Sequence, residues 1–291
     1  MIDPRLLEEL VSFAETGTLS GAAKKLHLTQ PTVTRGMQKL ESELGVALFN
    51  RSGNNKITLN TTGQLAAKEA ARLIAMESSM LEKVQNFAKG QKRFLVGSDA
   101  PGPLLISGRL QHKLPIKVEI DKDLLEEKDL LPAVENYHYQ VAFSSQEYQT
   151  ETCESRYVGY EELFLMCDKD SPLAQKKAVT FKDLAGVSFI VLQDIGPWKQ
   201  IKKNAIPNAN FIYQDDMHSL AELTKYSQLP VFRSNLSSPD YPAQDNRVPV
   251  GIADPKNRID FYAVYPKDQR KSVAPLLDLL SKNWPNDDFS D

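Results

Sequence analysis

Side chains that can hydrogen-bond to the edges of DNA bases are concentrated in one short stretch of the sequence. Amide, hydroxyl and guanidinium groups suit this chemistry, because the major groove presents both donors and acceptors. The residues concerned, with the proline that lies among them, are Gln30, Pro31, Thr34, Arg35 and Gln38. Helical periodicity places them on the first turn and outer half of a single helix. A helix surface of this composition is typical of a major-groove reader.

The helix that carries these residues has clear start signals and a buried face. Thr29 is a suitable N-cap, and Pro31 falls in the first turn, where its missing amide proton costs nothing. The apolar side chains at i, i+4, i+7 and i+11 predict a buried stripe made of Val33, Met37, Leu40 and Leu44. The polar side chains on the opposite side are therefore expected to face away from the core.

A second short helix precedes this one, and the pair spans about residues 18–37. Thr18 is its expected N-cap, and His27 lies in the tight turn that connects the two helices. A third helix starts at Pro4 and ends at Gly17, which completes a three-helix core. Spacing alone is equally compatible with an ordinary two-helix corner in an all-helical domain, since most such corners do not contact DNA.

A short hairpin is predicted directly after the helix that begins near Gln30. Gly45 ends that helix, and two apolar segments then flank a turn at residues 52–55. Arg51 and Lys56 stand beside the turn, where they can contact phosphates. The order of helices followed by a hairpin, or wing, predicts a winged helix-turn-helix DNA-binding domain over residues 1–60.

This region resembles the DNA-binding domain of the LysR-type transcriptional regulators. The matching positions run without a gap over about fifty residues: Phe13-Ala14, Gly17-Thr18, Ala22-Ala23, Leu26, Gln30-Pro31, Val33, Thr34-Arg35, Leu40-Glu41, Leu44-Gly45, Leu48-Phe49, Arg51 and Gly63. The resemblance implies a regulator that binds double-stranded promoter DNA. In such a regulator the outer helix residues would read bases, while Thr18 and Arg51 would hold phosphates. The resemblance also admits RNA polymerase as a partner.

Net charge differs between the two parts of the chain. Residues 1–90 contain 11 Lys and Arg against 9 Asp and Glu, a net of +2, whereas the rest carries −5. A net of +2 is small for a DNA-binding module, so affinity would depend on local placement of basic residues and on dimerisation. The chain opens directly on an amphipathic helix, and no apolar run reaches transmembrane length. We therefore expect a soluble, cytoplasmic protein without a membrane partner.

Residues 61–90 are expected to form one long linker helix. Its narrow apolar seam consists of Ala66, Ala70, Leu73, Met80, Val84 and Phe87. A single helix of this kind needs a partner. Packing against its own domain is one solution, but the family resemblance favours pairing with a second copy, giving a homodimer or homotetramer. The hinge to the next domain is expected at residues 90–92.

Residues 91–291 alternate between predicted strands and helices, which indicates two α/β lobes with mainly parallel sheets. Lobe I is expected at about 91–161 and 266–291, and lobe II at about 162–265. This part resembles the LysR-type effector-binding domain, which is similar to periplasmic solute-binding proteins. The fold class is therefore α/β overall, with a winged helix-turn-helix, a linker helix and a two-lobed domain.

Polar residues that directly follow predicted strands are the candidates for binding a small-molecule effector. They are Ser98, Asp99, Ser144 and Gln193. Ligands of open α/β sheets bind outside the carboxyl ends of strands, and hydroxyls with free helix amides suit a small anion. The alternative is that these residues only cap helices and turns.

Neither a catalytic site nor a metal or cofactor site is expected from the sequence. The four histidines lie far apart and form no His-x-x-x-His pair, and the Gly-x-Ser-x-Gly pattern of hydrolases is absent. Cys167 ends an apolar strand and is most simply a buried small side chain. Two functions therefore remain: a ligand-responsive transcriptional regulator, or a small-molecule binding protein whose N-terminal domain only mediates oligomerisation.

Overall fold

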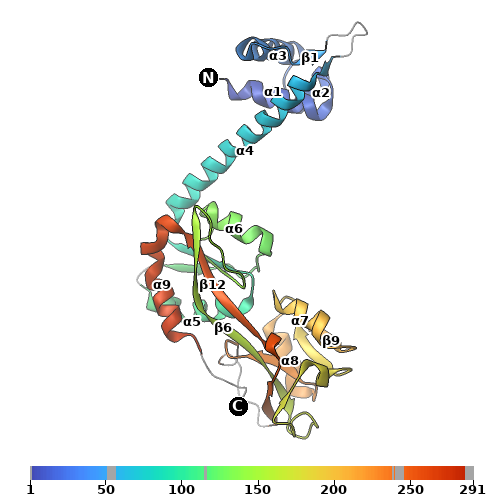
Figure 1. Cartoon of the computed structure of the whole chain (residues 1–291), viewed down its shortest axis with the longest axis vertical. Helices are drawn as coiled ribbons and strands as arrows, with labels where there is room; N and C mark the ends of the chain where they lie inside the picture. The colour runs from blue at the N-terminus through green and yellow to red at the C-terminus, as the bar shows by residue number, and fades with distance from the viewer. Residues whose placement is uncertain (1, 51–56, 115–116, 238, 240–245, 286–291) are drawn as a thin grey trace. The chain divides into compact units, whose positions relative to one another are not determined.

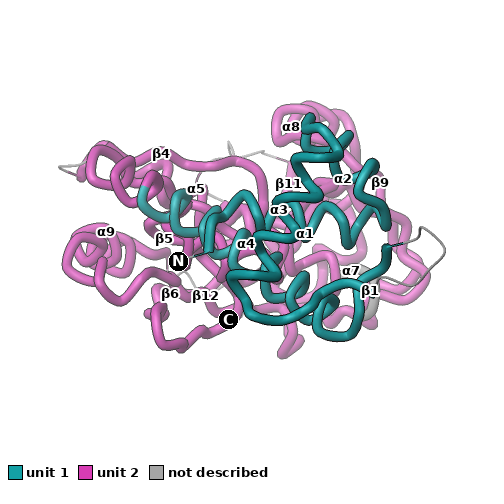
Figure 2. Tube along the Cα trace, turned by 90° about the horizontal axis from the view of Figure 1, so that it is seen from above, with its two compact units in different colours: residues 1–84 teal, residues 85–291 magenta. Residues whose placement is uncertain are grey.

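The computed structural model describes residues 2–50, 57–114, 117–237, 239 and 246–285. Two compact units divide the chain, residues 1–84 and residues 85–291 (Figure 2). Arg51 and Lys56, two of the predicted phosphate contacts, lie outside the described residues. Among the residues that are described, no helix is both long and apolar enough to cross a membrane.

The first unit contains three short helices, a two-stranded hairpin and most of a long helix (Figure 1). Its elements are α1 (Pro4–Thr16), α2 (Leu19–Lys25), α3 (Gln30–Leu44), β1 (Phe49–Asn50), β2 (Thr58–Leu59) and α4 (Thr61–Gly90). Thr18 and Thr29 cap α2 and α3 as expected, each accepting a hydrogen bond from a backbone amide of the first turn. Gly17 and Gly45 end α1 and α3 in the left-handed conformation.

The apolar stripe of α3 is buried over three of its four predicted positions. Val33, Met37 and Leu40 join one cluster with side chains of α1, α2 and the hairpin. The prediction for Leu44 is wrong, because its side chain is 37% exposed. The cluster continues from Leu40 to Leu48 in the segment after the helix, so the last turn of α3 projects beyond it.

Helix α4 begins with a cap that also ties it to the hairpin region. Asn60 accepts from the amide of Gly63 at 2.7 Å and donates to the carbonyl oxygen of Ala47 at 2.8 Å. A Cβ on Gly63 would lie only 2.2 Å from the carbonyl oxygen of Leu48, so this close approach requires glycine. Ala67 and Ala70 are buried, so the first turns of α4 pack against the core of the first unit.

The last turn of α4 belongs to the second unit and is docked there. Asn86 donates to the carbonyl oxygen of Asn136 at 3.1 Å, and the Phe87 ring meets the edge of Tyr137 with centroids 5.4 Å apart. The helix continues to Gly90, which lies against the Gln140 side chain. The predicted hinge at residues 90–92 therefore follows a turn that is already fixed to the second unit.

The second unit is an α/β structure built on one long mixed sheet. Its strands are β3 (Phe94–Ser98), β4 (Val118–Ile120), β5 (Val141–Ser144), β6 (Cys153–Asp168), β7 (Ala178–Val179), β8 (Ser188–Leu192), β9 (Asn210–Gln214), β10 (Val231–Ser234), β11 (Arg247–Ile252) and β12 (Arg258–Pro266). Its α-helices are α5 (Pro101–Leu110), α6 (Glu127–Glu135), α7 (Trp198–Ala205), α8 (Met217–Tyr226) and α9 (Arg270–Asn283).

The strand order is β4-β3-β5-β12-β6-β10-β8-β9, with β11 also paired to β6. The outer strands of each lobe pair in parallel: β3 with β4 and β5, and β8 with β9 and β10. The expectation of mainly parallel sheets fails in the centre, where β6 and β12 run antiparallel to each other and to their other neighbours. The two lobes are therefore joined by antiparallel strands.

The 16-residue strand β6 passes without a break from the first lobe into the second (Figure 1). β12 returns beside it and begins at Arg258, earlier than the lobe boundary expected near residue 265. The ladder between the two strands shifts register at Phe261 and Tyr262, opposite Gly159, which has φ +155°. A Cβ on Gly159 would lie 2.3 Å from the Trp284 ring, so the bulge needs a residue without a side chain.

Candidate nucleic-acid interface and ligand cavity

The predicted base-reading residues lie on one side of α3. Gln30, Pro31, Arg35 and Gln38 are exposed, whereas Thr34 is half-buried. Thr34 donates its hydroxyl to the carbonyl oxygen of Gln30 at 2.9 Å, and Arg35 Nε donates to that of Pro31 at 3.4 Å. These contacts hold both side chains along the helix without burying the guanidinium. The geometry leaves a polar helix face open to a large partner.

Basic residues near this face are already partly engaged with carboxylates. Lys25, in the last turn of α2, pairs with Glu15, and Lys39 of α3 lies 3.7 Å from Glu43. Thr18 is exposed and its hydroxyl accepts from the Gly21 amide at 3.0 Å, which leaves its proton available to a phosphate. Nearby carboxylates thus offset part of the positive charge of the first unit, in agreement with its small net charge.

A second surface of the first unit is apolar and lies along α4. Five large side chains between residues 73 and 84 are more than half exposed: Leu73, Met76, Met80, Leu81 and Val84. Met76 is not part of the seam predicted from the sequence, and it is the most exposed of the five, at 67%. Apolar side chains that recur on one helix at this exposure are typical of a surface that another helix covers.

Two of the predicted effector residues, Asp99 and Ser144, are hydrogen-bonded to each other, and a third, Ser98, bonds only to the backbone nearby. Asp99 Oδ2 accepts from the hydroxyls of Ser144 and Ser145, at 3.0 and 3.1 Å, and from the Ser145 amide at 2.9 Å. Ser98 Oγ accepts from the amide of Ala100. Burial raises the pKa of Asp99, and the bonds from the serines partly offset this. These side chains accept hydrogen bonds from backbone amides in the turns at the ends of β3 and β5.

Gln193, the fourth candidate, begins the loop between β8 and α7. Its side chain is exposed, and its backbone amide donates to the carbonyl oxygen of Gln214 at 2.9 Å. Farther along this loop, Gly196 has φ +56°, and a Cβ there would lie 2.0 Å from the carbonyl oxygen of Asp99. The loop from the second lobe therefore touches the first lobe at the segment that follows β3.

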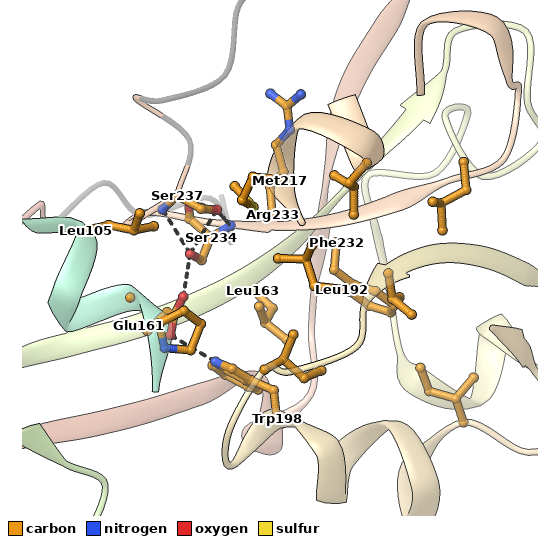
Figure 3. A pocket seen from close by; sticks show the side chains of 17 residues that line it. Leu105, Glu161, Leu163, Leu192, Trp198, Met217, Phe232, Arg233, Ser234 and Ser237 are labelled. Atoms are coloured by element: carbon orange, nitrogen blue, oxygen red, sulfur yellow. Dashed lines mark hydrogen bonds between the residues drawn. The ribbon is translucent and has the colours of Figure 1, made fainter. Parts of the chain in front are cut away.

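A cavity of about 110 Å³ lies between the same two segments. The first lobe contributes Pro101, Gly102 and Leu105 from α5, and the second lobe supplies most of the remaining lining. None of Ser98, Asp99, Ser144 and Gln193 lines it. The apolar side chains of the wall include Leu105, Leu163, Leu192, Trp198, Met217 and Phe232 (Figure 3).

The polar centre of this cavity is Glu161, which the sequence analysis did not identify. Its side chain accepts from the Ser234 hydroxyl at 2.6 Å and from Trp198 Nε1 at 2.8 Å (Figure 3). Glu161 is buried, and this burial raises the pKa of its carboxyl group, although the two hydrogen bonds lower it. No local motif marks this residue, because its two partners lie 37 and 73 positions away in the sequence.

Both cysteines are free thiols in buried positions. Burial raises the pKa of Cys153 and of Cys167 to about 11. Since the thiolate is the reactive form, burial disfavours reaction of both side chains at neutral pH. This agrees with the interpretation of Cys167 as a small core residue.

Both parts of the chain match family models. Residues 4–64 match the model for bacterial regulatory helix-turn-helix proteins of the lysR family, and residues 109–285 match the LysR substrate binding domain. The chain is 36% identical over 86 residues to the transcriptional regulator TcbR of Pseudomonas sp., covering 30% of this chain and 29% of that protein. It is 28% identical over 193 residues to the uncharacterised regulator YbhD of Escherichia coli, covering 63% and 59%. The matches thus span less than two thirds of these relatives.

Among solved structures, the chain is similar to a full-length variant of OxyR from Pseudomonas aeruginosa. The TM-score is 0.56 at 16% sequence identity, with 96% of this chain and 95% of that chain covered. At this identity the likeness concerns the fold alone. Because 96% of the chain is covered, the likeness extends over both units.

Proposed function

Because the chain belongs to the LysR family of bacterial transcriptional regulators, we propose that it binds a specific operator sequence under the control of a small molecule. In this proposal α3 enters the major groove, two copies pair through α4, and an effector occupies the cavity between the lobes. Each step has its own support in the described residues.

The observation that carries the proposal is the outward face of α3. Thr29 in the preceding loop caps its first turn. Gln30 and Arg35 are exposed on this face, where they can approach base edges. Side chains at the N-terminal end of a recognition helix are those that reach bases in helix-turn-helix proteins. Arginine can pair with guanine through two hydrogen bonds, which makes Arg35 the residue expected to contribute most to sequence discrimination.

Pairing through α4 would compensate for the small positive charge of the first unit. The exposed apolar side chains between residues 73 and 84 lose their contact with water when two such helices meet. A homodimer would then present two α3 helices to a two-fold symmetric site, and the second contact becomes intramolecular. A homotetramer would combine two such dimers.

An effector in the cavity could control this assembly because residues of both lobes line it. A ligand shifts an equilibrium between lobe arrangements only if it binds one of them more tightly. Contacts to α5 in the first lobe and to β8, β10 and α8 in the second would change together when the lobes move. The cavity is therefore a better-supported effector site than the cluster around Asp99.

The test is a mobility-shift titration with the DNA that flanks the protein's own gene, at moderate salt. Arg35→Ala should weaken binding by about 1–3 kcal/mol, which is roughly 5- to 150-fold. Arg72→Ala is the matched control, since it removes an exposed arginine from α4 of the same unit and should change affinity by less than about twofold.

Equal binding by the wild-type protein and Arg35→Ala would contradict the role assigned to Arg35. If neither protein binds DNA while a small molecule still stabilises the chain, the alternative gains support. The protein would then be a small-molecule binding protein with an N-terminal oligomerisation module.

A further inference from the structure

The cavity between the lobes has a carboxyl group in its wall, at Glu161, which bears on the chemistry of its ligand. The sequence predicted an anionic effector, held by serine hydroxyls and helix amides. The serines concerned, Ser98 and Ser144, do not line the cavity. The Glu161 side chain instead lies against the first turn of α5, where a Cβ on Gly102 would be 2.8 Å from its Oε2. An acidic side chain of the protein, Glu161, therefore already occupies the position beside the first turn of α5.

Glu161 retains hydrogen-bonding capacity for a ligand. A carboxylate offers about four acceptor positions, and the bonds from Ser234 and Trp198 use one on each oxygen. The Ser234 hydroxyl has two acceptors within reach, Glu161 at 2.6 Å and the Ser237 hydroxyl at 3.2 Å, and the shorter contact favours donation to Glu161. The carboxyl group is thus held in place by two donors, and a third donor can still reach it.

The remaining wall does not favour a negatively charged ligand. Most lining side chains are apolar, and Arg233, a cationic residue of the wall, directs its guanidinium away from Glu161 (Figure 3). A ligand carboxylate next to Glu161 would place two like charges in an apolar site, where one of them must take up a proton. A donor group meets no such penalty.

The volume of the cavity indicates the size of the group that fits inside it. A cavity of 150 Å³ lined by apolar side chains holds a benzene molecule, and this one has about 110 Å³. The space suits roughly four or five non-hydrogen atoms on the same scale. A branched aliphatic group of that size would contact Leu105, Leu163 and Phe232 while its polar end faces Glu161.

We propose that the effector cavity takes a small, mainly apolar molecule whose polar group, an amine or an alcohol, donates a hydrogen bond to Glu161, and that it rejects carboxylates. This inference rests on the proposed function, because it specifies the ligand of the same cavity. Glu161 is then the residue that determines specificity. Its contacts with α5, α7 and β10 connect the ligand to both lobes.

The test compares three probes with one carbon skeleton: isobutylamine, isobutanol and isobutyrate. Binding to the full chain is measured by ligand-observed NMR and by thermal shift at concentrations up to tens of millimolar, since molecules of this size bind weakly. We expect the amine and the alcohol to bind at least about tenfold more tightly than isobutyrate. Glu161→Gln should reduce the difference between amine and carboxylate to less than about threefold.

Two further variants guard against trivial explanations. Glu151→Gln makes the same chemical change at an exposed glutamate outside the cavity and should leave all three affinities unchanged. Leu105→Phe narrows the cavity while Glu161 is retained, and it should weaken the binding of the amine and of the alcohol alike. This second variant keeps the inference testable if Glu161→Gln fails to fold.

Equal or tighter binding of isobutyrate would overturn the inference, and so would the absence of a response to all three probes. DNA binding measured on the same preparations separates this failure from that of the proposed function. If the wild-type protein binds its promoter fragment and prefers the carboxylate, only the ligand assignment is wrong.

Discussion

The two units of the chain place their polar side chains in opposite ways. In the first unit the polar residues of interest are on the outer face of α3, while the large apolar side chains of α4 are also exposed. In the second unit the polar residues of interest are buried, as Ser98, Asp99 and Glu161 show, with the exception of Gln193. The first unit therefore exposes the side chains that we propose contact DNA and a second copy, whereas the second lines a cavity of small volume.

This difference shows when exposure and hydrogen bonding indicate function. Around α3 exposure alone does not indicate a partner, because polar side chains are ordinary on a surface; the argument there depends on amide and guanidinium groups that share one helix face. Around β3 and β5 the first task of a polar side chain is to satisfy buried neighbours. Asp99 Oδ2 accepts from three donors, whereas its buried Oδ1 accepts from none among the described residues. Glu161 accepts one hydrogen bond on each of its oxygens, and it also lines a cavity.

The largest expected effect concerns the exposed apolar surface of α4. Met76→Lys places a charge among side chains that are expected to pair, so the dimer should dissociate. DNA affinity should then fall about 100-fold because the second contact is lost. Sedimentation and mobility-shift titrations would measure the two changes. Ser78→Lys adds the same charge at another exposed position of α4, and a comparable loss there would argue against pairing through this surface.

A smaller effect is expected from removing the central acceptor of the second unit. Asp99→Ala leaves two serine hydroxyls and one amide without their acceptor, so the free energy of unfolding should fall by about 2 kcal/mol. Urea unfolding would measure it, with Asp123→Ala, at an exposed aspartate, as the control. Probe binding to the folded variant should remain. Unchanged stability with lost probe binding would return Asp99 to the effector site.

The smallest effect is a difference in pH dependence caused by Glu161. Burial raises its folded-state pKa above the ordinary value of 4.5, so the folded chain holds this proton more strongly than the unfolded chain. Its contribution to stability is complete below 4.5 and declines as pH rises through the folded pKa. Glu161→Gln removes the titrating group.

Urea unfolding from about pH 5 to about pH 8 would therefore show the variant gaining stability relative to the wild type as pH rises. The difference in free energy of unfolding between Glu151→Gln and the wild type should not change with pH across the same range. A relative gain toward low pH would mean that Glu161 is stabilised as a carboxylate, and that the interior of the second unit favours charge.

Local signals made the first unit predictable. Caps at Thr18 and Thr29, the glycines that end α1 and α3, and a helical apolar period act over a few residues each, and the structure confirms them. Leu44 shows the limit of this reasoning, because periodicity does not reveal where a packing partner ends. The contact of Arg35 with DNA remains a prediction.

The second unit depends on contacts between distant parts of the sequence, and its prediction was less complete. The first half of β6 carries charged and polar residues, so the sequence indicates only the apolar strand that ends at Cys167. Because this part of β6 is not evident from the sequence, the antiparallel pairing at the centre of the sheet is not predicted either. Glu161 was missed for the same reason, since a lone glutamate in an unrecognised strand resembles a solvent-exposed residue.

The continuity of β6 has a mechanical consequence. The two lobes are not connected by slack loops, since β6 and β12 form a ladder that runs from one lobe toward the other. Any rearrangement of the lobes would therefore twist this two-stranded ribbon, whose ladder is already irregular at the bulge beside Gly159, where Trp284 packs closely. Residues that never touch an effector would then set the stiffness against which the effector acts.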